Sequence, residues 1–194
     1  MSLLLQGFMG TFEGAPYTVT KTHDNGLEER EYTPYKWAAT KFVPNIDGDD
    51  PGQSTSPMFR RLFNYITGEN ETKQKIAMTI PVSTWVSTEK QGAEQSREMC
   101  FYIGQDIQDN PPKPTNEHVY IVERKPMTIL TRKISGYPNE TTWKQEYQNI
   151  LEMAKDMNVD VDQTGYYQNG YDAPQKFINR RNELWLVKKP PQEP

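Results

Sequence analysis

Short runs of alternating apolar and polar residues occur along most of this chain, and they limit its fold more than any other feature. Alternation with a period of two, rich in Val, Ile, Thr and aromatic residues and bounded by Gly, Pro or Asn, is typical of β-strands. The runs read YTVTKT, KWAATKFV, MTIPVSTWV, REMCFYIG, HVYIVER, MTILTRKI and NELWLVKK. We therefore expect about seven or eight strands.

The first of two segments with a helical period covers residues 57 to 66. Four apolar side chains share one face of this segment: Phe59, Leu62, Phe63 and Ile66. Met58 and Tyr65 lie at the edges of that face. The opposite face carries Arg60, Arg61 and Asn64. Gly68 suits the end of a helix, so we expect an amphipathic helix here.

The second helical segment covers residues 139 to 157. Its apolar residues follow i, i+4, i+7 and i+8 spacing: Trp143, Tyr147, Ile150, Leu151 and Ala154. Thr142 and Gln145 fit a capping box at its start. A Pro-rich loop, residues 109 to 117, separates the two helical segments. We therefore expect two amphipathic helices in an otherwise β-rich chain.

The two halves of the chain resemble each other. Residues 28 to 42 and residues 122 to 134 each contain Glu-Arg, a Pro and an alternating run, followed by a linker and a helical segment. A chance match of this length is the alternative. A true duplication predicts one barrel-like sheet with two related helices packed on it, and a ligand cleft between those helices.

Composition excludes several classes of protein. A chain of 194 residues is one large domain more readily than two very small ones. No apolar run approaches the roughly 20 residues that span a bilayer, so stable membrane insertion is not expected. The single cysteine, Cys100, forms neither an internal disulfide nor a Cys-based zinc site. We therefore expect a cytoplasmic protein, with residues 1–11 and 190–194 as tails.

Charge and motif content argue against nucleic-acid binding and catalysis. Lys and Arg number 22 against 26 Asp and Glu, and the net charge is −4, so the basic surface that binds nucleic acid is not expected. No serine-histidine-aspartate order, Gly-rich phosphate loop or metal-ligand cluster is evident, and we expect no enzyme. Glu183 is the exception, because its strand position suggests a half-buried carboxylate. It could pair with Arg180 or Arg181, hold a cationic ligand or act as a base; pairing is the commonest outcome.

Four stretches resemble the SOUL/heme-binding protein family: EEREYTPYKWAAT, FRRLFNYITGEN, KIAMTIPVSTWV and GYDAPQKFINRRNELWLVKK. The resemblance implies an α+β fold, a distorted antiparallel β-barrel with two flanking amphipathic α-helices, built from a pseudo-duplicated unit. It implies a single domain over residues 12–189 that binds heme or another porphyrin non-covalently and reversibly. A more distant resemblance, to regulator domains that take up hydrophobic cations, concerns the fold alone.

The same resemblance implies where a tetrapyrrole binds. In the family, heme lies in an apolar groove beside the first helix, with basic side chains of a later loop near its propionates. The matching residues here are Met58, Leu62, Tyr65, Ile66, Lys176, Arg180 and Arg181. Core packing is the alternative for the helix residues, most of all for Phe59, Phe63 and Ile66, and a solvated loop or salt bridges are the alternative for the cations. Some members carry a proposed axial histidine where this chain has Glu31.

Other iron ligands are not evident, and a second function stays open. His23 precedes Asn25-Gly26, a turn signal, and we expect a solvated side chain. His118 begins a strand at the surface, and Cys100 is expected to be a small buried residue. The alternative to tetrapyrrole binding is a non-enzymatic interaction module or scaffold with weak protein partners and incidental heme binding. Its support is that residues 149–159 distantly resemble helices that dock in partner grooves.

Overall fold

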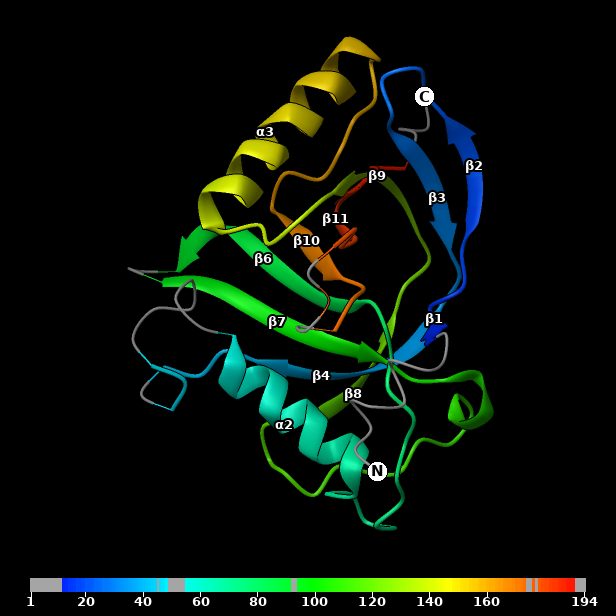
Figure 1. Cartoon of the computed structure of the whole chain (residues 1–194), viewed down its shortest axis with the longest axis vertical. Coiled ribbons are helices and arrows are strands. Elements are labelled where there is room, and N and C mark those ends of the chain that lie inside the picture. Colours follow the sequence, from blue (N-terminus) through cyan, green and yellow to red (C-terminus); the bar gives the residue numbers. More distant parts are fainter. Residues whose placement is uncertain are drawn as a thin grey trace.

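The computed structural model describes residues 12–44, 46–48, 55–91, 94–173, 176 and 178–190. The predicted tails were residues 1–11 and 190–194, and all of these residues except Pro190 lie outside this part of the chain. The described residues form eleven strands, two α-helices and one short 3-10 helix (Figure 1). The helices are α2 (Ser56–Thr67) and α3 (Glu140–Asp156). The strands and the 3-10 helix are β1 (Glu13–Gly14), β2 (Thr18–Thr22), β3 (Glu28–Tyr32), β4 (Tyr35–Lys41), β5 (Thr79–Ile80), β6 (Val82–Gln91), β7 (Glu94–Tyr102), η1 (Gln105–Ile107), β8 (Tyr120–Arg124), β9 (Met127–Ile134), β10 (Gly165–Gly170) and β11 (Asn182–Val187).

Nine of these strands form one curled antiparallel sheet, in the order β2-β3-β9-β11-β10-β6-β7-β4-β8. Strands β1 and β5 form a separate parallel pair. In Figure 1, α2 lies against one half of the curled sheet, along β4 and β7, and α3 covers the other half. The expected fold class, a distorted antiparallel barrel flanked by two helices, is therefore confirmed.

The sheet order reveals the pseudo-duplicated unit. The unit β3-β4-α2-β6-β7 is followed along the chain by β8-β9-α3-β10-β11. The corresponding strands of the two units are β3 and β8, β4 and β9, β6 and β10, and β7 and β11. If each strand is replaced by its counterpart, the sheet order β3-β9-β11-β10-β6-β7-β4-β8 becomes the same order in reverse. The first strand of each unit pairs with the second strand of the other, β3 with β9 and β8 with β4. The sequence repeat predicts one sheet with two related helices, and the structure adds that the two halves are interlocked within that sheet.

The expected number of strands was too low. Strand β3 has the sequence EEREY, whose charges hide its strand character, and β10 has the sequence GYYQNG, without a β-branched residue. Both strands are nevertheless paired on both sides. The run MTIPVSTWV is divided at Pro81 into β5 and β6, because proline lacks the N–H that a continuous ladder requires.

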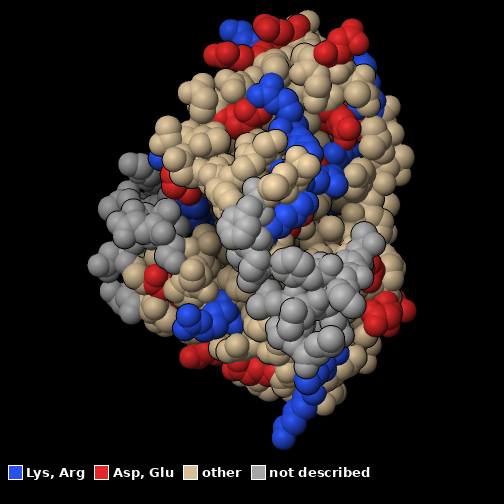
Figure 2. Space-filling view, viewed as in Figure 1, with Lys and Arg blue, Asp and Glu red and all other residues tan. Residues whose placement is uncertain are grey.

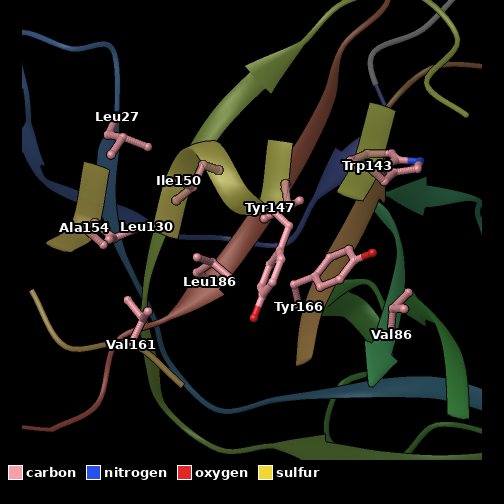
Figure 3. Close-up of a cluster of buried hydrophobic side chains, with 11 residues drawn as sticks. Leu27, Val86, Leu130, Trp143, Tyr147, Ile150, Ala154, Val161, Tyr166 and Leu186 are labelled. Carbon is pink, nitrogen blue, oxygen red and sulfur yellow. The ribbon is translucent and has the colours of Figure 1, made fainter. Parts of the chain in front are cut away.

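Alternate residues of each strand point to opposite faces of the sheet, and the buried side chains form three hydrophobic clusters. Side chains on the α3 side of the sheet pack against Trp143, Tyr147, Ile150 and Ala154 of α3 (Figure 3). The α2 side forms a second cluster. The face turned away from both helices, here called the inner face, holds a third cluster rich in aromatic rings, including Trp37 and Trp185. Burial of all three apolar surfaces stabilises the sheet and both helices.

Helix α2 is rotated relative to the face that its sequence pattern suggests. Its buried residues are Met58, Arg61, Leu62, Tyr65 and Ile66, whereas Phe59 and Phe63 are only partly buried. The expectation that Arg61 lies on the solvent side was wrong. The Arg61 guanidinium is buried because it donates to the Asp47 carboxylate, to Thr40 Oγ1 at 2.9 Å and to the Lys41 carbonyl at 2.9 Å.

Helix α3 begins one residue after Asn139, and the predicted capping box at Thr142 and Gln145 was wrong. The Asn139 side chain accepts a hydrogen bond from the Thr142 N–H at 2.8 Å, so Asn139 is the N-cap. Trp143, Tyr147, Ile150 and Ala154 are buried as expected, and Leu151 is partly buried. The apolar face of α3, which the interaction-module hypothesis requires, is covered by the sheet.

Candidate functional site

An apolar pocket lies between α2 and the segment that follows β10. We call it the α2 pocket, and its lining residues are Phe12, Phe59, Phe63, Met78, Ile80, Val82, Gly170, Tyr171, Asp172 and Ala173. It encloses about 60 Å³, which is small beside the roughly 300–1,000 Å³ of most small-molecule sites. Of these ten residues only Asp172 is charged. A flat apolar molecule can therefore cover this pocket or insert one edge into it.

Two stacked aromatic rings form the α2 wall of this pocket. The ring centroids of Phe59 and Phe63 are 5.9 Å apart with an interplanar angle of 16°. Phe59 also packs edge to face against Phe101 of β7, at 5.3 Å. Phe59 and Phe63, which lie one helical turn apart, therefore form a flat apolar surface that contacts the sheet through Phe101.

The predicted helix residues lie behind that wall. Met58, Leu62, Tyr65 and Ile66 are all almost fully buried between α2 and the sheet, and none of them lines the α2 pocket. The Tyr65 hydroxyl donates to the Pro112 carbonyl at 2.8 Å, which ties the Pro-rich loop to the helix. Burial raises the pKa of Tyr65 to about 12. The expectation that Met58 and Tyr65 are half-exposed edge residues was therefore wrong.

Two of the predicted loop cations lie close together, in the loop between β10 and β11. Lys176 is half exposed, and its Nζ lies 2.6 Å from the Asp172 carboxylate. The Arg180 guanidinium is buried, with Nη1 donating to the Ala173 carbonyl at 2.7 Å and to the Lys176 carbonyl at 3.1 Å. Arg180 also stacks on the Tyr137 ring at 4.3 Å. Arg180 therefore holds the loop together, while Lys176 keeps an accessible charge.

Asp172 connects this loop to the α2 pocket. Its carboxylate accepts from the Arg181 N–H at 2.5 Å as well as from Lys176. Burial acts to raise the pKa of Asp172, but the hydrogen bonds from Lys176 and the Arg181 backbone outweigh it, and the pKa is lowered. The charged form of Asp172 therefore fixes the segment that borders the pocket.

The third loop cation, Arg181, points into a buried network around Glu183. Arg181 Nε and Nη2 donate to Glu183 Oε1 at 2.8 and 2.6 Å. The other Glu183 oxygen accepts from Arg30 Nη1 at 2.7 Å, from the Tyr171 hydroxyl at 2.6 Å and from Trp185 Nε1 at 3.0 Å. Burial acts to raise the pKa of Glu183, but the bonds from Arg30, Tyr171 and Trp185 lower it.

Of the alternatives for Glu183, the structure therefore supports structural pairing. The carboxylate is almost completely buried and both of its oxygens are occupied. Of the two expected partners, Arg181 pairs with Glu183, whereas Arg180 donates to backbone carbonyls of its own loop. Arg30 is the partner that sequence analysis missed. The Glu-x-Arg pattern in β3 was the available signal, but it does not indicate which carboxylate Arg30 meets across the sheet.

The remaining ligand candidates lie away from the α2 pocket. His23 is not solvated, since its side chain is 11% exposed and Nε2 lies 2.8 Å from Glu29 Oε1. His118 is partly exposed, as expected, but it precedes β8, which begins at Tyr120. Cys100 is fully buried, and burial raises its pKa to about 11. Glu31 is exposed on β3 and faces solvent.

The space between the starts of the two helices is polar. Arg97 of β7 and Glu140 of α3 line it, and their ion pair is bidentate, at 3.0 and 2.8 Å. The space at the expected ligand cleft between the helices is thus polar, whereas the apolar pocket lies beside α2. Across the described ranges, no cluster of three metal-ligating side chains occurs. Neither helix of that part of the chain is long and apolar enough to cross a membrane.

Solved structures of low sequence identity share this fold. The C-terminal domain of EcmrR superposes with a TM-score of 0.57 at 11% identity, covering 89% of this chain and 98% of that domain. SAV2435 bound to tetraphenylphosphonium superposes with a TM-score of 0.52 at 8% identity, covering 84% of this chain and 93% of that protein. At such identities the likeness concerns the fold alone.

Protein relatives at higher identity carry heme-binding names. Human heme-binding protein 2 is 32% identical over 163 residues, which cover 84% of this chain and 78% of the human protein. Mouse heme-binding protein 1 is 27% identical over 190 residues, which cover 97% of this chain and 99% of the mouse protein. The model of the SOUL heme-binding protein family matches residues 12–187. With its interlocked double unit and this match over nearly its whole length, the chain belongs to the SOUL heme-binding protein family.

Proposed function

We propose that this protein binds heme, or a related porphyrin, reversibly and at about one per chain in the α2 pocket. The observation that carries the proposal is the stacked pair Phe59 and Phe63, facing a second apolar wall at residues 170–173. Such a surface matches the flat apolar face of a porphyrin. The family membership and the names of the relatives give the class of ligand.

The small volume of the pocket suggests how a porphyrin binds. An enclosed space of about 60 Å³ cannot contain a whole porphyrin. The ring therefore covers the pocket, with one face or edge on the apolar lining and the rest near solvent. Most of the binding free energy then comes from burial of ring area, and an incompletely buried ring dissociates readily. Binding is therefore reversible.

The propionates need cations at the rim of the pocket. Figure 2 shows that both basic and acidic side chains occur on the visible face of the molecule. We assign the propionate contact first to Lys176, whose Nζ can exchange Asp172 for a ligand carboxylate. Arg181 is partly exposed and contributes charge nearby. Arg180 supports the site by holding the loop.

We retain Met58, Leu62, Tyr65 and Ile66 as a supporting layer of the proposed site. Their burial fixes α2 on the sheet and so fixes the positions of Phe59 and Phe63. The proposal treats residues 12–189 as one domain, because strands from both halves share one sheet. It places the protein in the cytoplasm as a binding protein without catalytic activity.

An absorbance titration with hemin tests the proposal, with albumin as a competitor and gel filtration to establish stoichiometry. Iron-free protoporphyrin is titrated in parallel, because it retains the ring and the propionates. We expect saturable binding of both, with affinities within about tenfold of each other. An unsaturable spectral change for both ligands would contradict the proposal and favour an interaction module or scaffold on this fold.

The matched variants are Phe63→Ala and Phe42→Ala. Both residues are partly buried and pack against the same hydrophobic cluster, but only Phe63 lines the α2 pocket. We expect Phe63→Ala to weaken protoporphyrin binding several-fold and Phe42→Ala to leave it nearly unchanged. Equal losses in the two variants would place the site elsewhere.

A further inference from the structure

The lining of the α2 pocket contains few atoms that can bind iron. Oxygen, nitrogen and sulfur side-chain atoms are the ligands that heme iron accepts from proteins. Among the described lining residues, only Met78, Tyr171 and Asp172 carry such an atom. The existing contacts of each side chain decide whether its atom is free to bind iron.

The two oxygen groups are already engaged. The Tyr171 hydroxyl donates to Glu183 at 2.6 Å, and burial together with the Glu183 charge raises its pKa well above the ordinary value. The phenolate that iron would require is therefore strongly disfavoured. The Asp172 carboxylate accepts from Lys176 and from the Arg181 backbone, and these bonds hold the loop.

Met78 differs from both. Its side chain is partly buried, lines the pocket and packs against the α2 cluster. Two methionine sulfurs accept hydrogen bonds, Met157 from Asn25 and Met153 from Arg132. In the part of the chain that the structure describes, the Met78 sulfur accepts none. A thioether sulfur is a known axial ligand of heme iron.

The backbone next to Met78 is held in place. Thr79, the next residue, donates its hydroxyl to the Tyr102 carbonyl at 2.5 Å, and it pairs with Glu13 in the β1–β5 ladder. Ile80 lines the same pocket. The position of Met78 is therefore fixed from the sheet side, so that a ligand would meet a preformed contact and order little additional chain.

We propose that Met78 provides a sulfur ligand to the iron of heme bound over the α2 pocket. This inference rests on the proposed function and adds to it a preference between iron states. A neutral, polarizable sulfur is a soft ligand and favours ferrous over ferric iron. The iron bond adds to the contribution of ring burial, so ferrous heme binds more tightly than iron-free protoporphyrin.

The test compares the full chain with Met78→Leu and with Met127→Leu. Leucine conserves the volume of methionine well, and Met127 is a partly buried methionine at a strand start, outside the α2 pocket. Each protein is titrated with hemin, with dithionite-reduced heme and with iron-free protoporphyrin. We expect Met78→Leu to lower the affinity for reduced heme by roughly three- to tenfold and to leave the affinity for protoporphyrin unchanged. Met127→Leu should behave as the wild type does.

Spectroscopy separates the failure of this inference from the failure of the proposed function. X-ray absorption at the iron edge of the wild-type complex needs no variant and should reveal a sulfur neighbour. Only nitrogen and oxygen neighbours, or equal affinities of Met78→Leu and wild type for reduced heme, would overturn the role of Met78 while porphyrin binding stands. If wild-type protein binds neither heme nor protoporphyrin saturably, both proposals fail.

Discussion

Arg30 and Glu183 lie 153 positions apart in the chain and meet on the inner face of the sheet, where Arg30 Nη1 donates to Glu183 Oε2 at 2.7 Å. Arg30 belongs to β3 and Glu183 to β11, and β9 lies between these strands. Both side chains are buried. Because β3 and β11 come from different units of the pseudo-duplicated fold, this ion pair joins the two halves of the chain.

Replacement of Glu183 by glutamine should destabilise the fold strongly. Glu183→Gln leaves the buried Arg30 guanidinium without its main counter-charge, although Glu28 still pairs with it at the edge. Loss of one partner of a buried pair costs about 3–5 kcal/mol. Urea unfolding measures the loss, and Glu117→Gln is the control because that side chain is 88% exposed. Similar unfolding free energies for the two variants would contradict the role of the pair.

The free energy of unfolding should decrease as the pH falls below about 4.5, which is the ordinary pKa of a glutamate. The folded-state pKa of Glu183 is lowered because bonds from Arg30, Tyr171 and Trp185 outweigh burial. The contribution of this group to stability is therefore complete above its ordinary pKa and is lost as the pH falls through the folded-state pKa. Urea midpoints measured between about pH 3 and pH 7 test this. The urea midpoint of Glu183→Gln should fall less steeply with decreasing pH than that of the wild type. An identical dependence of the two midpoints on pH would contradict this prediction.

Substitutions at two adjacent positions of α2 should have different effects, one mainly on stability and the other mainly on ligand binding. Leu62 is fully buried, so Leu62→Ala should cost about 2–5 kcal/mol of unfolding free energy. Phe63 is partly buried and lines the α2 pocket, and Phe63→Ala should mainly weaken protoporphyrin binding. Thermal melts and protoporphyrin titrations of both variants provide the comparison. If Leu62→Ala folds and loses more affinity for protoporphyrin than Phe63→Ala does, the ligand contacts the face of α2 that contains Leu62, as the sequence suggested.

The Lys176 charge should matter for propionates and little for stability. Lys176→Ala removes a half-exposed cation, and we expect heme binding to weaken by about 1 kcal/mol, with the loss shrinking in high salt. Lys113→Ala is the matched control, because Lys113 is an exposed lysine paired with Glu71 at 3.2 Å. Heme dimethyl ester should not distinguish wild type from Lys176→Ala. If it does, the cation acts on something other than the propionates.

Gly165 should tolerate no side chain. A Cβ placed there would lie 2.6 Å from the Val86 carbonyl oxygen and would overlap the Trp85 ring. Gly165→Ala should therefore cost about 1–3 kcal/mol or more, whereas at Gly14 the nearest atom is 3.8 Å away. Urea unfolding of Gly165→Ala and Gly14→Ala compares them. Equal stabilities would mean that β10 and β6 separate easily.

Local periodicity accounts for much of what the sequence predicts correctly. Alternation places most of the sheet strands, the 3.6-residue period places both helices, and the Asn25-Gly26 turn forms with Gly26 at φ +83°. The burial of Cys100 also agrees with its place in an alternating strand. These features depend on residues close in the chain, so a single sequence contains the information.

The identity of the proposed site residues depends only partly on local pattern. The resemblance to the family led to the first helix and to the loop after β10, and the α2 pocket does lie between α2 and residues 170–173. It did not determine which residues of α2 face that pocket. Two overlapping apolar faces, one containing Phe59 and Phe63 and the other Met58 and Tyr65, fit the same helical period.

The sequence by itself determined both helices and most of the strands, and its resemblance to known proteins led to the family. Only the tertiary structure decided that Arg61 is buried against Asp47, which sets the rotation of α2, and that Arg30, not Arg180, pairs with Glu183. The physical reason is the same in both cases. A buried charge requires a partner, and the partner is supplied by strand register or loop path far along the chain, which local periodicity does not specify.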